Sequence, residues 1–409
     1  MADFKNTVEK ILKSVDVEIN GSRPWDLQVH DERFYSRVLS GGSLAFGESY
    51  MDGWWDCKAL DQLSDKLLSG HIDKQVRASI PSFFIVYLKA YLFNTQSKKR
   101  AYIVGEKHYD VGNDLFSLML DERMNYSCGY WRNAENLDQA QINKLDLICR
   151  KMHLRPGINL LEIGCGWGGF AKYAAENYGV SVHGVTISRQ QVEFAKDSCK
   201  DLDVSIELKD YRELEGQYDC IVSVGMFEHV GYKNYKNFMK VVHRCLKEDG
   251  LFLLHTIGRN YSGRATEPWI NKYIFPNGMT PSAQQISAAL EGLFVVEDWH
   301  NFGQDYDATL MSWNKNFQSN FDKLKDLYDD RFKRMWEYYL LMCAGTFRAR
   351  RNQLWQLVMT KRGIKGGYTY KNNPRFDEAR KDTENCCLLY TSDAADDTPC
   401  VDLGGRRII

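Results

Sequence analysis

A glycine-rich turn after a short apolar run is the feature that most constrains how this chain folds. Residues 160–169 are LLEIGCGWGG, with one acid, Glu162, inside the apolar run and glycines at positions 164, 166, 168 and 169. We interpret the run as a buried strand that turns sharply into a helix over residues 170–177. Glycines let the backbone approach a ligand closely, and the helix N-terminus offers free N–H groups. A nucleotide-like cofactor is the expected occupant, although structural glycine turns are common and the loop alone does not establish one.

Strands and helices alternate after this loop. Six strands are predicted at residues 159–163, 181–187, 204–208, 218–224, 251–256 and 294–299. Helices are predicted between them, over residues 190–200 and 235–246 among others. This alternation is typical of a doubly wound α/β sheet, in which ligands bind at the carboxyl ends of the strands.

The residues around the loop favour one cofactor over another. A dinucleotide site needs an acid at the end of the second strand, whereas that strand here ends in VTIS at residues 185–188. The nearest candidate for a ribose is the amide of Gln191, and an acid follows the third strand at Asp210. S-adenosylmethionine therefore fits better than a nicotinamide. Asp210 taken alone is equally typical of a turn residue or a helix cap.

Composition excludes several classes of function. The chain has 409 residues, which predicts two or three domains at about 100 to 200 residues each. A hydrophobic fraction of 44% and a net charge of -1 indicate a globular protein and disfavour nucleic acid as the main partner. The 11 cysteines form no CxxC pair, so we expect no metal site, no disulfide framework and a reducing compartment. Neither a secretory leader nor an apolar run of about 18 residues is visible.

The first 75 residues are predicted to form a small α+β domain without a catalytic constellation. Helical spacing precedes an alternating strand at residues 15–19, a returning strand at 27–29 and a second amphipathic helix at 34–39.

Residues 76–100 are predicted to form a linker helix with basic residues at both ends of an apolar stretch. Such a helix can lie on an anionic lipid surface or be buried between two domains, and periodicity favours the buried arrangement.

The end of the chain departs from a globular pattern. Residues 347–363 are expected to form a closing amphipathic helix, and periodicity stops at about residue 364. The last stretch, CCLLYTSDAADDTPCVDLGGRRII, resembles a translated sequencing adapter. We hypothesise that residues 361–409 are a disordered or artefactual tail.

Six separated motifs in order resemble the cyclopropane-fatty-acyl-phospholipid synthases, a family related to the mycolic acid cyclopropane synthases. They lie at residues 108–131, 160–169, 185–191, 223–231, 253–258 and 271–278, and the likeness runs from about residue 15 to 360. The resemblance implies a class I S-adenosylmethionine-dependent methyltransferase fold over residues 101–360. It also implies an enzyme that adds a methylene across the cis double bond of an acyl chain in a membrane phospholipid.

The family's catalytic set carries over to five positions. In the family a bound bicarbonate ion acts as the base, and by resemblance it is held here by Cys128, Glu228, His255, Tyr306 and the backbone N–H of Ile257. An anion beside a glutamate requires donors that outweigh the like charge, or a proton on one partner. Cys128 could instead be a buried small hydrophobe, and His229, next to Glu228, is expected to be structural.

The resemblance also completes the expected cofactor site and the partners. The predicted S-adenosylmethionine ligands are Tyr126, Ser127, Gly164, Gly166, Gln191, Asp210, Tyr211 and Arg212. A phospholipid substrate implies a cytoplasmic protein in peripheral contact with the membrane, and family members are often homodimers.

Three functions remain open at this point. The first is cyclopropanation, the second is a lipid C-methyltransferase that does not close the ring, and the third is a lipid-binding protein with a dead catalytic domain. The presence of Cys128, Glu228, His255 and Tyr306 argues against the third.

Overall fold

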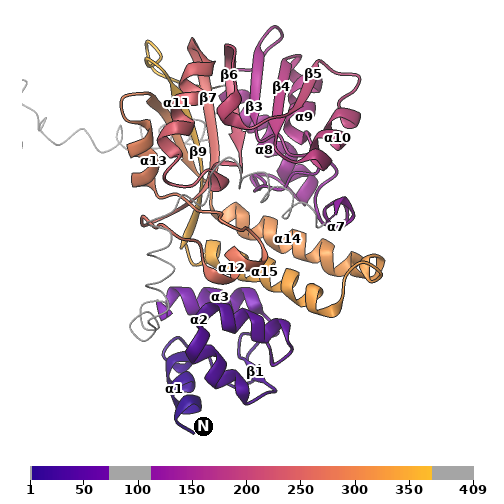
Figure 1. Ribbon diagram of the computed structural model, residues 1–409, viewed down its shortest axis with the longest axis vertical. Coiled ribbons are helices and arrows are strands. Elements are labelled where there is room, and N and C mark those ends of the chain that lie inside the picture. The colour runs from indigo at the N-terminus through magenta and orange to yellow at the C-terminus, as the bar shows by residue number, and fades with distance from the viewer. Residues whose placement is uncertain (1, 73–111, 371–409) are drawn as a thin grey trace, which may run out of the picture. The chain divides into compact units, whose positions relative to one another are not determined.

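A computed structural model describes residues 2–72 and 112–370 of the chain (Figure 1). The chain divides into two units, residues 1–367 and 368–409, and the helices and strands of the described residues all lie in the first. The predicted linker helix at 76–100 and nearly all of the predicted tail lie outside the described residues. Within the described part, no helix is both long and apolar enough to cross a membrane.

The core of the first unit is a seven-stranded sheet in the order β5-β4-β3-β6-β7-β9-β8. Its strands are β3 (Asn159–Ile163), β4 (Ser181–Thr186), β5 (Val204–Leu208), β6 (Tyr218–Val224), β7 (Leu246–Arg259), β8 (Val295–Asn301) and β9 (Asn352–Thr360). Neighbours from β5 to β7 are parallel, and β9 runs antiparallel to both β7 and β8. The predicted doubly wound α/β sheet is confirmed.

Helices connect the strands and cover the sheet. They are α8 (Leu137–Lys151), α9 (Gly169–Tyr178), α10 (Arg189–Ser198), α11 (Tyr235–Cys245), α12 (Pro268–Tyr273) and α13 (Ala283–Leu290), with 3-10 turns η1 (Tyr211–Glu213) and η2 (Phe227–His229). Because side chains alternate along a strand, Leu161 and Ile163 face the core formed with α11 and α13. Glu162 therefore faces the opposite side, toward α8 and α9.

One predicted helix is wrong. Residues 347–363 do not continue as a helix, because α15 (Asp330–Arg348) ends at Arg348 and β9 follows as an interior strand of the sheet. Every residue of β9 after Asn352 is buried, so both faces of the strand are covered and the two-residue alternation that marks a half-exposed strand is lost.

The N-terminal region is more helical than predicted. It contains α1 (Ala2–Lys13), β1 (Gln28–Val29), α2 (Arg33–Met51), β2 (Trp55–Asp56) and α3 (Leu60–Ser69). The strand predicted at residues 15–19 reduces to an isolated bridge between Ile19 and Leu27, and β1 pairs instead with β2. The predicted domain boundary near residue 75 falls outside the described residues and stays a prediction.

A second helical group lies between this region and the sheet (Figure 1). It comprises α7 (Asn113–Met119), α14 (Gln304–Asn320), the 3-10 turn η3 (Phe321–Leu324) and α15. Helix α3 packs along α15, and Arg348 of α15 pairs with Asp61 of α3 and Asp307 of α14. Glu48 of α2 accepts hydrogen bonds from Tyr273 Oη (2.9 Å) and Lys272 Nζ (2.5 Å) at the end of α12. The N-terminal helices are thus fixed to the elements that carry the site.

Candidate active site

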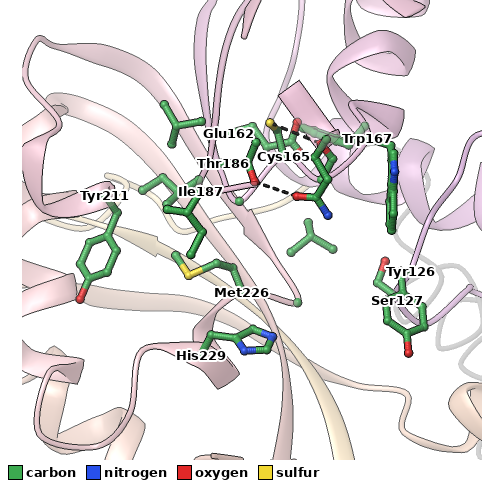
Figure 2. Close-up of a pocket in the computed structure, with 18 of the residues that line it drawn as sticks. Tyr126, Ser127, Glu162, Cys165, Trp167, Thr186, Ile187, Tyr211, Met226 and His229 are labelled. Carbon is green, nitrogen blue, oxygen red and sulfur yellow. Dashed lines mark hydrogen bonds between the residues drawn. The ribbon is translucent and has the colours of Figure 1, made fainter. Parts of the chain in front are cut away.

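A pocket opens at the carboxyl ends of β3, β4 and β6, as expected for a sheet of this topology (Figure 2). The glycine loop after β3 forms one wall, and the ends of β4 and β6 form the next two. All eight residues predicted to bind S-adenosylmethionine line this pocket: Tyr126, Ser127, Gly164, Gly166, Gln191, Asp210, Tyr211 and Arg212. Their role in binding stays a prediction.

The glycine loop shows why glycine occupies two of these positions. Gly164 has φ +86°, and a Cβ there would lie 2.7 Å from both Cβ and Cγ of Met226. Gly166 has φ +55°, but a Cβ there would meet no atom within 4 Å. Gly164 is therefore required by packing as well as by its backbone, whereas Gly166 borders open space that a ligand can fill.

The segment Asn125–Ser127 forms another wall of the pocket and is held in place by hydrogen bonds from side chains of α8. Lys144 Nζ donates to Ser127 Oγ (2.9 Å) and Asn125 Oδ1 (3.3 Å), and Gln141 Nε2 donates to Ser127 O (2.8 Å). The Tyr126 hydroxyl bonds that of Tyr339 at 2.8 Å. These contacts fix a chain segment that would otherwise be a free loop.

Lys144 and Glu162 are charged groups buried at the floor of the pocket. Burial lowers the pKa of Lys144 to about 8, although Asp121 and Glu162 partly oppose that shift. Burial raises the pKa of Glu162 to about 8, and the charge of Lys144 acts against the rise. Glu162 Oε2 has no hydrogen-bond partner within the described part of the chain. The floor thus holds a polar atom available to a ligand.

Gln191 and Asp210 already have partners of their own. Gln191 Oε1 accepts from Thr186 Oγ1 at 2.7 Å, a contact drawn in Figure 2. Asp210 accepts from the backbone N–H (2.9 Å) and the guanidinium (3.0 Å) of Arg212, and so caps η1. Asp210 is therefore a helix cap that also borders the pocket, and its role in binding the cofactor stays a prediction.

The five predicted catalytic positions lie outside the pocket lining but next to it. Cys128 follows Ser127, and Glu228 precedes His229, two residues of the lining. The backbone N–H of Gly225, also in the lining, donates to His255 O at 2.9 Å. The set therefore sits directly behind the pocket wall.

Contacts connect the members of this set. The N–H of Ile257 donates to Glu228 Oε1 at 2.6 Å, and its predicted role as a donor to the anion stays a prediction. Glu228 Oε2 and His255 Nε2 are buried, and neither has a hydrogen-bond partner among residues 2–72 and 112–370. The Cys128 thiol donates to Gly129 O at 3.1 Å.

Burial sets the protonation of these groups. It raises the pKa of Cys128 and of Tyr306 well above their ordinary values, so both stay protonated. An ionised Glu228 lies close enough to Tyr306 to raise its pKa further. Burial raises the pKa of Glu228 to about 7, and it lowers the pKa of His255 well below its ordinary value. Near neutral pH Cys128, His255 and Tyr306 are thus uncharged, and Glu228 is partly protonated.

Several lining residues escaped prediction from the sequence. His229, expected to be structural, lines the pocket, and burial lowers its pKa to about 4. Trp167 lies inside the glycine motif and could have been found there, whereas Lys144 belongs to no motif and gave no signal.

Comparisons with known proteins identify the family. Residues 96–357 match the family model described as mycolic acid cyclopropane synthetase. The chain is 55% identical over 361 residues to cyclopropane-fatty-acyl-phospholipid synthase of Escherichia coli K12, covering 88% of this chain and 93% of that protein. It is 38% identical over 268 residues to a probable fatty acid methyltransferase of Pseudomonas putida, covering 62% of this chain and 68% of that protein.

A solved structure supports the same family assignment. The mycolic acid cyclopropane synthase CmaA1, complexed with SAH and CTAB, superposes with a TM-score of 0.60 and 31% identity, covering 64% of this chain and 98% of that one. The resemblance stated from the motifs is confirmed, and the chain belongs to the mycolic acid cyclopropane synthetase family of S-adenosylmethionine-dependent methyltransferases.

Proposed function

We propose that this protein transfers a methylene group from S-adenosylmethionine across the cis double bond of an unsaturated acyl chain in a membrane phospholipid, giving a cyclopropane ring. The observation that carries the proposal is the pair of buried polar atoms Glu228 Oε2 and His255 Nε2, which lack partners within the described residues beside the cofactor pocket. Buried polar atoms are normally hydrogen-bonded, so such a pair marks a place for a small polar group.

The pocket suits S-adenosylmethionine, which supplies an electrophilic methyl group when bound. Tyr126 and Ser127 lie on one side of the pocket and Tyr211 on the opposite side (Figure 2). The glycine loop, Gln191 and Asp210 also line it. The family member CmaA1 was solved with SAH, which supports the same class of ligand here. Open space beside Gly166 leaves room for a ligand against the backbone.

The alkene that accepts the methyl group determines the task of the residues beside the cofactor pocket. An isolated alkene has no acidic proton, so these residues must orient it and exclude water rather than deprotonate it. Ring closure then removes one proton from the transferred methyl group, and a bicarbonate ion would supply the base for that proton. Residues Cys128, Glu228, His255, Tyr306 and the N–H of Ile257 would hold the ion.

The protonation states support this assignment. Cys128 and Tyr306 keep their protons, and a Glu228 carboxyl with a pKa of about 7 is partly protonated at neutral pH. A neutral His255 adds one further N–H. Three neutral donors and the protonated form of Glu228 accommodate an anion, whereas the ionised form of Glu228 would repel it.

The proposal extends to the cellular context. A substrate that stays in a bilayer requires peripheral contact with the membrane, and cytoplasmic localisation is consistent with free thiols at all eight cysteines of the described residues. We include a homodimer in the proposal on the family resemblance alone.

The test uses purified protein, vesicles of an unsaturated phospholipid and isotopically labelled S-adenosylmethionine. Mass spectrometry of the acyl chains should show the gain of one CH₂ with loss of the double bond. Unmodified chains, with bicarbonate and cofactor both present, would contradict the proposal.

A lipid C-methyltransferase that does not close the ring is the second candidate. It is favoured by the similarity to the probable fatty acid methyltransferase of Pseudomonas putida. In that case the product gains one CH₂ and keeps its unsaturation.

A further inference from the structure

His255 faces a buried glutamine on the neighbouring strand. In the register of β7 against β9, His255 lies directly opposite Gln356, and their side chains are 1% and 0% exposed. Gln356 Nε2 lies 3.3 Å from His255 Nδ1. Residues directly opposite in an antiparallel pair project to the same face, so the contact follows from the register of the sheet.

Because His255 is neutral, its contact with Gln356 decides which ring nitrogen carries the proton. The ring is fully buried, and Lys144 and Lys151 both disfavour a second positive charge beside them. A neutral imidazole carries one N–H, and the hydrogen bond at one ring nitrogen decides which nitrogen holds it.

The two orientations of the Gln356 amide predict opposite tautomers. With the NH₂ group toward His255, Nδ1 accepts a hydrogen bond and the proton resides on Nε2. Gln356 Oε1 then has no hydrogen-bond partner within the described chain. With the amide reversed, Nδ1 would carry the proton and donate to Gln356 Oε1. The NH₂ group would then be the amide atom without a hydrogen-bond partner among the described residues. In the first orientation the Nε2–H donates to the proposed anion, and Gln356 Oε1 is the atom left without a partner among the described residues. The reversed orientation would leave the buried NH₂ donor unpaired and turn a lone pair of Nε2 toward the anion, so the first orientation is favoured.

We propose that Gln356 is a positioning residue that holds His255 as the Nε2–H tautomer, so that the buried Nε2 presents a hydrogen-bond donor to the catalytic anion. The anion and the choice of tautomer rest on the proposed function, whereas the contact between Gln356 and His255 Nδ1 rests on the strand register. His255 Nε2 is the ring atom that lacks a partner among the described residues, so this N–H is available to a ligand.

The chain offers a matched control on the same strand. Gln353 is a second buried glutamine of β9, but it lies opposite Gly258 and its Nε2 donates to Arg350 O at 2.9 Å. The change Gln353→Met removes the same atoms from the same strand as Gln356→Met without touching His255.

The first measurement is made on the unaltered protein. Nitrogen NMR of histidine-labelled protein, with His255 assigned by comparison with His255→Gln, reports which ring nitrogen carries the proton. We expect Nε2–H in the unaltered protein and in Gln353→Met. We also expect protonation of Nδ1 in Gln356→Glu, because a carboxylate can only accept from that nitrogen.

The second measurement is the bicarbonate concentration that gives half-maximal turnover. In Gln356→Met it should rise between about two- and tenfold, the net effect of one hydrogen bond, while the KM for S-adenosylmethionine stays unchanged. Gln353→Met should change neither value.

The outcomes separate this inference from the proposed function. A proton on Nδ1 in the unaltered protein, or an unprotonated Nδ1 in Gln356→Glu, would overturn the inference even if cyclopropane lipids form. The expected tautomers in a protein that makes no cyclopropane would uphold the role of Gln356 and overturn the proposed function alone.

Discussion

The two glycines of the cofactor loop differ in what they tolerate, and alanine substitutions should separate folding from binding. Gly164 and Gly166 both have positive φ, at +86° and +55°. A methyl group at Gly164 would lie 2.7 Å from Cβ and Cγ of Met226, close to its backbone rather than at a flexible end. A methyl group at Gly166 would meet no atom within 4 Å.

The magnitudes follow from these contacts. The left-handed conformation costs an alanine roughly 1–2 kcal/mol of unfolding free energy at either position. Crowding against Met226 adds about 1–3 kcal/mol at Gly164. Gly164→Ala should therefore destabilise the fold by roughly 2–5 kcal/mol, and Gly166→Ala by about 1–2 kcal/mol.

Affinity for the cofactor, rather than stability, is the property that Gly166→Ala should change most. Because the methyl group of Gly166→Ala enters the open space of the pocket, affinity for S-adenosylhomocysteine should fall about tenfold or more, equivalent to at least about 1.4 kcal/mol. Guanidinium unfolding of the ligand-free proteins and isothermal titration with S-adenosylhomocysteine measure the two quantities. Equal losses of stability, together with unchanged affinity in Gly166→Ala, would refute the reasoning.

Three further predictions concern the charged and catalytic groups. The pKa of Glu228 is raised from 4.5 to about 7 in the fold, so its ionisation lowers the free energy of unfolding increasingly from pH 4.5 to 7. Glu228→Gln should remove this loss, which reaches about 3 kcal/mol, when unfolding is measured across this pH range. Lys144→Met removes the donor to Ser127 Oγ, and the KM for S-adenosylmethionine should rise about tenfold, with an unchanged KM contradicting the role of the lysine. Cys128→Ser and His255→Ala should lower kcat at least about tenfold while titration shows cofactor affinity within about twofold of the unaltered protein, and wild-type rates in both would count against the site.

The parallel half of the fold was predictable because its strands are short, apolar and punctuated by turns. Strands β3, β5 and β6 have the bounds expected from the sequence, and β4 ends one residue early. Strand β9 was missed because it pairs on both edges and is buried on both faces, so its apolar run lacks the alternation of a half-exposed strand.

The candidate site was predictable where residues follow strands or lie inside motifs. Gly164, Gly166 and Asp210 lie in the turns that follow strands, and Gln191 lies in the first turn of α10 after β4, where the topology brings ligands. Lys144 lies in the middle of α8 and reaches the pocket only through packing, a relation that the periodicity of a helix does not encode.

Gln356 illustrates the same limit more sharply. It contacts His255 only because β9 returns antiparallel between β7 and β8, about 100 residues along the chain. A strand predicted as a helix cannot supply that register, so the contact emerges only from the folded sheet.

S-adenosylmethionine that carries a fully deuterated methyl group distinguishes formation of the cyclopropane ring from methyl transfer alone. Closure of the ring removes one hydrogen of the transferred methyl, so mass spectrometry of the modified phospholipid should find two deuterium atoms in each added carbon unit and no remaining double bond. Retention of all three deuterium atoms with the double bond kept would contradict cyclopropanation and indicate methyl transfer without ring closure.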